Sequence, residues 1–188
     1  LNKSKEGRLI FEHDEVDVSG LMYSRKRKVL TGVSYTVAKN EIVFFDTLRE
    51  SLQQKLEEKL PGYEVGITSF SEDETKAVVV TYSDKSRGTY YYYDLDKNKL
   101  IELGQVSPWL NEEDMSEMKP VHYKSRDGLI INGYLSLPKG TNGKNLPVVV
   151  NPHGGPWHRD SWGYNSEVQF LTNRGFAVFQ MNFRGSTG

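Results

Sequence analysis

Cysteine is absent from the 188-residue chain, which excludes disulfides and thiolate chemistry within it. The chain also has no apolar run long enough to cross a membrane. Its polar N-terminal stretch does not have the pattern of a signal peptide. These absences argue against a disulfide-stapled scaffold and an intrinsic membrane protein. They fit a reducing compartment, so we expect a cytoplasmic protein.

A strong charge of either sign is also missing, because 24 Lys and Arg side chains oppose 25 Asp and Glu side chains, for a net charge of −1. This balance argues against nucleic acid or an anionic membrane as a partner over the whole surface. The basic run at residues 25–28 is the one local exception. We interpret it as a solvated turn between strands and not as a nucleic-acid patch.

The four histidines do not indicate a metal site. His13 and His122 fall in β-like segments, whereas His153 and His158 lie five residues apart with Asp160 nearby. Histidine and carboxylate ligands suit zinc, but this spacing matches no common zinc motif and further ligands are not close in the sequence. We therefore expect neither a metal nor a cofactor.

The first half of the chain is typical of antiparallel β-structure. Short β-prone runs are separated by Gly, Asn, Asp and Ser, at residues 9–11, 29–37, 41–45, 65–70, 76–82, 89–95 and 100–103. The last four runs occupy about forty residues with tight polar turns, which is the spacing of one propeller blade. A plain meander or sandwich has the same spacing. The rings of residues 90–93 are expected to alternate between the two faces of their strand.

One segment of the first half breaks this pattern and predicts a helix over residues 48–60. Thr47 and Glu50 have the spacing of a capping box. Leucines then recur every fourth residue, and Pro61-Gly62 ends the run. The helix is expected to be amphipathic and to be an insertion before or within the blade-like unit.

The second half changes to a pattern of mixed α/β structure. After an irregular stretch at residues 104–120, residues 121–137 predict a hairpin with a Gly-containing turn. The β-branched run 148–150, a helical pattern over 164–174 and the apolar run 176–181 form a βαβ unit, with 148–150 expected to be covered on both faces. We predict a domain boundary in the irregular stretch.

The strand at 148–150 runs directly into Asn151-Pro152-His153-Gly154-Gly155-Pro156. A turn at the carboxyl end of a central strand lies where open α/β sheets bind ligands. Gly154 and Gly155 have no Cβ, so a ligand can approach the backbone closely. In α/β-hydrolases a loop of this type supplies one N–H donor of an oxyanion hole. The flanking prolines are expected to stiffen the loop.

Two segments, "NPHGGPWHRDSW" and "LTNRGFAVFQMNFRGSTG", resemble the prolyl oligopeptidase family of serine peptidases, in its acylaminoacyl-peptidase and dipeptidyl-aminopeptidase-like branch. The resemblance implies β-propeller-type antiparallel blades followed by the N-terminal part of an α/β-hydrolase fold. The implied division is residues 1–107, the last propeller blades; 108–120, a linker; and 121–188, the start of the hydrolase domain.

The same resemblance implies roles for two short motifs. The Gly155 N–H would be an oxyanion donor beside Gly154, and His153 would shape the loop. Arg184 and Gly185 would structure a turn next to the active site.

The triad of this family is missing from the 188 residues. The family's nucleophile stands in a Gly-x-Ser-x-Gly elbow, whereas Ser186 is preceded at the first glycine position by Arg184. The resemblance implies that the catalytic Ser, Asp and His lie beyond residue 188, so we expect a fragment that is inactive alone. In the intact enzyme the partner would be a peptide substrate.

Other interpretations remain. The chain can be a non-catalytic scaffold or binding module, or it can belong to an esterase of the same fold. A half-built parallel sheet would leave an unpaired edge after residues 176–181. That edge would favour self-association or a homo-oligomer.

Overall fold

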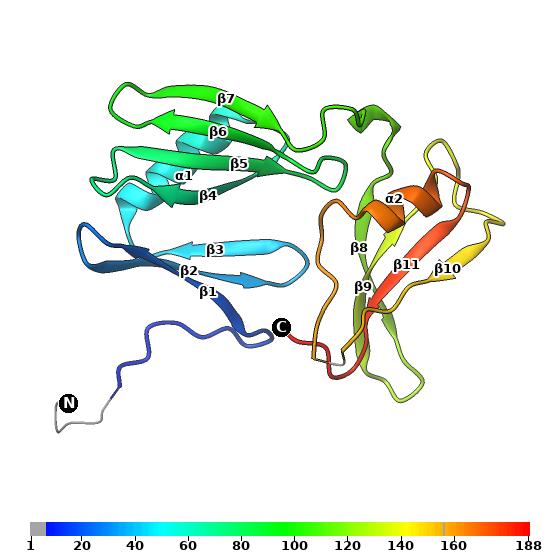
Figure 1. The fold of residues 1–188 in the computed structure, drawn as a ribbon. Coiled ribbons are helices and arrows are strands. Elements are labelled where there is room, and N and C mark those ends of the chain that lie inside the picture. The colour runs from blue at the N-terminus through cyan, green and yellow to red at the C-terminus, as the bar shows by residue number, and fades with distance from the viewer. Residues whose placement is uncertain (1–6, 156) are drawn as a thin grey trace.

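The computed structural model describes residues 7–155 and 157–188, and the strands of this part form three β-sheets (Figure 1). The N-terminal sheet is antiparallel and contains β1 (Val18–Ser24), β2 (Val29–Thr36) and β3 (Asn40–Phe44) in that order. The predicted strand at 9–11 is wrong, because this segment is not hydrogen-bonded into a sheet and Leu9 and Ile10 are 66% and 63% exposed. Strand β1 was not predicted from the sequence.

The basic run 25–28 forms the turn between β1 and β2, as predicted. Its Arg27 guanidinium binds both carboxylate oxygens of Asp46, at 2.5 and 2.9 Å. The ammonium group of Lys26 donates to the main-chain oxygen of Asp73. These two side chains are therefore held by the protein itself.

The predicted helix is α1 (Thr47–Lys59), but its N-cap is Asp46 and not Thr47. The Asp46 side chain accepts a hydrogen bond from the Arg49 N–H at 2.9 Å. The expected capping box of Thr47 and Glu50 is therefore wrong by one residue. An aspartate at this position satisfies a free amide of the first turn and also adds a negative charge at the positive end of the helix.

The second sheet, here called the meander sheet, contains β4 (Glu64–Phe70), β5 (Lys76–Tyr82), β6 (Thr89–Asp94) and β7 (Lys99–Gln105) in sequential order. Helix α1 packs on one face of it through a cluster of hydrophobic side chains, and the buried side-chain amide of Gln53 on the helix donates to the Val65 main-chain oxygen at 2.8 Å. The buried members of the cluster are Leu56, Leu60, Val65, Ala77, Val79 and Tyr93. The predicted alternation holds on β6, where Tyr93 is 2% exposed and Tyr90 is 41% exposed.

The third sheet, here called the mixed sheet, has the order β10-β11-β9-β8. Its strands are β8 (Met118–Lys124), β9 (Ile130–Ser136), β10 (Val148–Val150) and β11 (Ala177–Asn182). Strands β10 and β11 are parallel, and the other pairs are antiparallel. The hairpin and the βαβ unit were therefore predicted correctly, although β8 begins three residues before the expected start, inside the predicted linker.

Two expectations about this sheet are wrong. Strand β10 is at its edge, with Val148 59% and Val150 54% exposed, so it is not covered on both faces. Strand β11 is paired on both sides, with β10 and with β9, so it does not leave an unpaired edge. The side of β11 that was expected to be unpaired is occupied by the antiparallel strand β9.

Helix α2 (Ser166–Thr172) connects β10 to β11 and is shorter than the predicted 164–174. The side chain of Asn165 caps it by accepting from the N–H groups of Glu167 and Val168. Val168 is buried, whereas Phe170 is 54% exposed. Within residues 7–155 and 157–188, no helix has the length and apolarity needed to cross a membrane.

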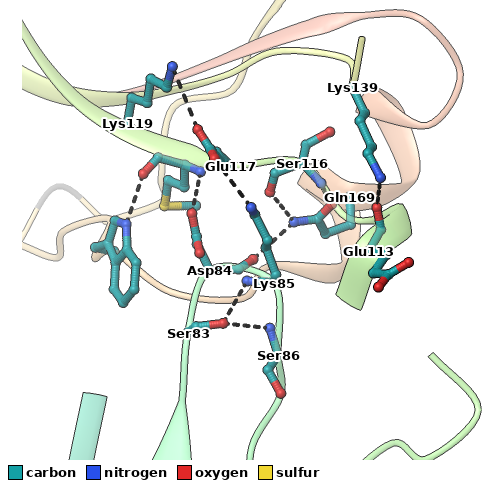
Figure 2. A network of polar contacts seen from close by, with 12 residues as sticks. Ser83, Asp84, Lys85, Ser86, Glu113, Ser116, Glu117, Lys119, Lys139 and Gln169 are labelled. Carbon is teal, nitrogen blue, oxygen red and sulfur yellow. Dashed lines mark hydrogen bonds and ion pairs between the residues drawn. The ribbon is translucent and has the colours of Figure 1, made fainter. Parts of the chain in front are cut away.

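A polar network joins helix α2 to the meander sheet (Figure 2). The buried side-chain amide of Gln169 donates to the main-chain oxygens of Asp84 and Ser116, at 3.0 and 2.9 Å, and accepts from the Ser116 N–H at 2.8 Å. The Asp84 carboxylate accepts from the Met118 N–H at 2.7 Å. The β5–β6 turn, the start of β8 and helix α2 are thus held together around one amide group. A short 3-10 turn, Glu112–Asp114, lies in the connection before β8.

Candidate functional site

The glycine loop, residues 151–163, leaves the carboxyl end of β10 and leads toward α2; Pro156, expected to stiffen it, lies outside the described residues. The Asn151 N–H donates to the Phe179 main-chain oxygen at 2.8 Å, which extends the β10–β11 pairing into the loop. The Asn151 side-chain amide donates to the Glu167 carboxylate at 3.3 Å. The first residue of the loop is therefore bound to both β11 and α2.

His153 joins this loop to the turn that follows β11. Its Nε2 lies 2.7 Å from the Ser186 hydroxyl oxygen, and its ring stacks on Phe183 with centroids 4.4 Å apart and an interplanar angle of 16°. Its Nδ1 lies 2.8 Å from the main-chain oxygen of Gly154. A carbonyl oxygen only accepts, so Nδ1 carries a proton; in the neutral ring Nε2 then accepts from Ser186.

The two glycines differ in their backbone constraints. Gly155 has φ +135°, and a Cβ there would lie 2.9 Å from the Trp157 nitrogen. Gly154 is outside the left-handed region, and a Cβ there would meet nothing within 4 Å. Among the hydrogen bonds between described residues, none uses the N–H of either glycine. Both are exposed. Gly155 is thus the residue whose backbone conformation depends on the missing side chain.

The predicted turn at Arg184 and Gly185 lies beside the glycine loop. Gly185 has φ +89°, and the Thr187 N–H donates to the His158 main-chain oxygen at 3.0 Å. The Arg184 side chain points elsewhere, because its guanidinium binds the Asp127 carboxylate at 2.6 Å in the β8–β9 turn. The structure therefore brings the two predicted motifs together through their backbones and His153, but not through Arg184.

The pKa of Asp127 is lowered to about 2, first by the hydroxyl of Ser125, 2.5 Å from its carboxylate, and then by the hydrogen bond from Arg184. The ion pair is exposed, with 63% and 55% of the two side chains accessible. Exposed pairs of this kind contribute little to stability. The ion pair connects the turn after β11 to the β8–β9 hairpin.

Asp160, in the glycine loop, is a half-buried polar residue that was not predicted from the sequence to have a place in the site. One carboxylate oxygen accepts from the Gln180 side chain at 2.8 Å, while the other is buried with no partner among residues 7–155 and 157–188. Burial raises the pKa of Asp160; the Gln180 hydrogen bond and the charges of His153 and His158 oppose this shift. A glutamine inside the apolar run of β11 is the sequence signal that could have indicated a buried polar partner.

His153 and Ser186 have the separation of a base and a nucleophile, but their surroundings do not complete a triad. The ring nitrogen of His153 that does not face Ser186, Nδ1, lies against the main-chain oxygen of Gly154. In a triad this nitrogen binds a carboxylate. Within the described part of the chain, no group of three or more His, Asp or Glu side chains converges as metal ligands. The arrangement can donate hydrogen bonds from exposed loop amides.

A cleft of about 510 Å³ lies at the junction of the three sheets, and Trp162, near the end of the glycine loop, is among its lining residues. Lysine and acidic side chains line it together with two aromatic rings: Lys39, Tyr63, Asp84, Lys85, Glu112, Glu117, Lys119 and Trp162. Glu117 pairs with both Lys85 and Lys119. Because the cleft contains none of the predicted site residues, the candidate site rests on the loop geometry alone.

No family model matches the chain. Among curated proteins, it is 33% identical over 187 residues to dipeptidyl aminopeptidase BIII of Pseudoxanthomonas mexicana, covering 96% of this chain and 27% of that protein. It is 29% identical over 203 residues to dipeptidyl peptidase family member 6 of Caenorhabditis elegans, again covering 96% of this chain and 27% of the relative. The chain thus spans about a quarter of the length of these relatives.

Solved structures give the same picture of the fold. A prolyl endopeptidase matches with a TM-score of 0.65 and 18% identity, covering 93% of this chain and 25% of that one. The acylaminoacyl peptidase of Pyrococcus horikoshii matches with a TM-score of 0.56 and 19% identity, covering 92% of this chain and 26% of that one. By sequence and by fold, the chain is a member of the prolyl oligopeptidase family and corresponds to a segment of its longer peptidases.

Proposed function

We propose that the chain is a segment of a serine peptidase that cleaves short peptides near their N-terminus. In this proposal residues 1–107 are the last blades of a propeller, 108–120 a linker, and 121–188 the start of an α/β-hydrolase domain. The catalytic Ser, Asp and His lie outside the 188 residues, so this segment alone does not hydrolyse peptides. The names of its relatives, a dipeptidyl aminopeptidase and a dipeptidyl peptidase, support the substrate class.

The observation that carries the proposal is the glycine loop at the carboxyl end of β10. Strand β10 is parallel to β11, and ligands of open α/β sheets bind beyond the carboxyl ends of such strands. The exposed amide of Gly155, with φ +135°, is not used by any hydrogen bond between described residues. A main-chain donor in this state is available to a negatively charged oxygen.

In the intact enzyme the serine hydroxyl would attack the carbonyl carbon of the scissile peptide bond while the triad histidine accepts its proton. The carbonyl oxygen would become an oxyanion and accept a hydrogen bond from the Gly155 N–H. A single donor of this kind contributes about 3–4 kcal/mol to the stability of the transition state. His153, held by Ser186 and Phe183, would keep the loop in the shape that presents this amide.

The test is to label the intact protein with a fluorophosphonate probe and to locate the modified serine by mass spectrometry. The 188-residue chain serves as the control. We expect one labelled serine outside residues 1–188 and no label on the control. A label on Ser186 would contradict the proposal and make His153 and Ser186 the reacting pair. An intact protein that takes no label and hydrolyses nothing would instead be the non-catalytic scaffold.

Activity on two substrate classes distinguishes the peptidase from an esterase of the same fold. Peptide anilides with a free or blocked N-terminus should be hydrolysed by the intact protein with higher kcat/KM than short acyl esters. Hydrolysis of the esters alone would favour the esterase.

A further inference from the structure

The glycine loop is attached to the N-terminal sheet through Arg159. The guanidinium of Arg159 donates from one terminal nitrogen to the main-chain oxygen of Thr36 at 2.8 Å, and from the other to that of Val37 at 2.9 Å. Its Nε donates to the Asp160 main-chain oxygen at 3.2 Å. All three nitrogens of one planar group are thus used, which fixes its orientation more firmly than a single contact would.

The same β2–β3 hairpin is held at two further points. The hydroxyl of Tyr134, on β9, donates to the Ala38 main-chain oxygen at 2.7 Å, and Tyr134 is only 2% exposed. The ammonium of Lys39 lies 3.6 Å from the ring centroid of Trp162, near the end of the glycine loop. Consecutive residues of the hairpin, 36–39, therefore contact both the mixed sheet and the loop.

On the loop side, Arg159 stands between two residues whose backbones are tied to β11 and the turn after it. The His158 main-chain oxygen accepts from the Thr187 N–H at 3.0 Å. The Asp160 N–H donates to the Asn182 side chain at 2.8 Å. The His158 backbone is also close to Gly155, since a Cβ at Gly155 would lie 3.4 Å from the His158 nitrogen. A displacement of the Arg159 backbone would be passed through the adjacent His158 to the neighbourhood of Gly155.

We propose that Arg159 is a positioning residue through which the β2–β3 hairpin sets the position of the Gly155 N–H. This inference rests on the proposed role of that amide as an oxyanion donor. It gives the N-terminal sheet a part in the rate of the chemical step, because the sheet holds the loop that stabilises the transition state. Arg159 itself need not touch the substrate.

Three substitutions and one control in the intact protein separate this role from a local one. Arg159→Met keeps an unbranched apolar stem, although a shorter one, and removes every donor. Tyr134→Phe leaves Arg159 and the loop sequence unchanged but removes the hydroxyl that holds Ala38, so it loosens the hairpin from the other side. Arg159→Lys keeps the charge but not the planar pair of donors. Arg174→Met is the matched control, because Arg174 lies on Phe170 at the exposed face of α2.

The first readout is kcat and KM with a peptide anilide, normalised to active sites titrated with the fluorophosphonate. Arg159→Met should lower kcat on the order of ten- to a hundredfold with KM changed less than about threefold, since a misplacement of about 1 Å can cost a hundredfold. Arg159→Lys should fall between this variant and the wild type. Tyr134→Phe should lower kcat in the same direction by a smaller factor, and Arg174→Met should leave it unchanged.

The second readout, amide hydrogen exchange followed by mass spectrometry, does not require activity. Arg159→Met and Tyr134→Phe should each accelerate exchange in peptides from both residues 34–40 and residues 151–163. If the wild type proves to have no peptidase activity, the proposed function fails, while exchange still decides whether hairpin and loop are coupled. Unchanged exchange in the hairpin of Arg159→Met, or in the loop of Tyr134→Phe, would overturn the inference, as would an unchanged kcat in an active enzyme.

Discussion

Nε2 of His153 lies 2.7 Å from the hydroxyl oxygen of Ser186, although the two residues are 33 positions apart. This contact closes the glycine loop onto the turn after β11. The Phe183 ring, stacked on the imidazole, supports the same position from another side. Two sequence motifs that were identified separately therefore form one structural unit at the carboxyl ends of two parallel strands.

Ser186→Ala should lower the free energy of unfolding by about 1 kcal/mol, the usual net contribution of one hydrogen bond. The stacking on Phe183 remains in this variant, so the loss is limited to the hydroxyl. Urea unfolding measures the change. Ser161→Ala is the control, because Ser161 is exposed and its hydroxyl bonds to none of the described residues. Equal losses in the two variants would show that the His153 contact does not stabilise the fold.

Gly155→Ala in the intact protein should lower kcat by about a hundred- to a thousandfold, the usual effect of removing an oxyanion donor. The added Cβ is incompatible with φ +135° and would lie 2.9 Å from the Trp157 nitrogen, so the loop must change shape. Gly154→Ala is the matched control and should stay within about threefold of the wild type, since its Cβ meets nothing within 4 Å. Steady-state kinetics with a peptide anilide decide between them. A reversed order would place the reacting oxygen nearer Gly154.

Local sequence patterns predicted those parts of the fold that depend on neighbouring residues. Strand β5 has the predicted bounds, Lys76–Tyr82, because a β-branched run between two turn signals has few alternatives. Helix α1 was found from its leucine spacing, and only its cap was displaced by one residue. The glycine turn also lies at its predicted place, the carboxyl end of β10.

Apart from the wrong strand at 9–11 and the missed strand β1, the errors concern order in space, which a local pattern does not contain. The run 148–150 is as apolar as a central strand, yet it is at the sheet edge, because among the described residues only β11 pairs with it. Arg159 could not be identified either, because its acceptors are main-chain oxygens 122 and 123 residues earlier in the chain. Every residue has such an oxygen, so the sequence carries no signal for the partner.

Asp46→Ala should lower the free energy of unfolding by about 1 kcal/mol, within the range known for N-cap residues. It removes the acceptor of the Arg49 N–H and the partner of Arg27. Thr47→Ala, at the position that the sequence pattern favoured as the cap, should change the stability far less. Chemical denaturation of both variants tests this. A larger loss for Thr47→Ala would restore the capping box as the helix start.

Gln169→Leu should lower the free energy of unfolding more than Asp46→Ala does, by at least about 2 kcal/mol, because it leaves buried main-chain groups without partners. These are the Ser116 N–H and the oxygens of Ser116 and Asp84, all bound by the one amide (Figure 2). Gln54→Leu, at an exposed position of α1, is the control for adding an apolar side chain. Similar stabilities of the two variants would mean that water satisfies the freed groups.

Asp160 should make the stability of the fold depend on pH in the opposite sense to a paired carboxylate. Burial raises its folded-state pKa above the unfolded value of about 3.9. The folded protein therefore binds more protons than the unfolded chain once the pH exceeds about 3.9, and stability falls as the pH rises through the folded-state pKa.

Asp160→Asn removes this ionisation and keeps an acceptor for Gln180. The stability of the variant relative to the wild type should therefore increase from pH 4 to pH 7, which urea unfolding at several pH values measures. A difference that is constant over this range would mean that Asp160 has the same pKa in the folded and unfolded states. A difference that shrinks would mean that the charges of His153 and His158 outweigh burial and lower that pKa.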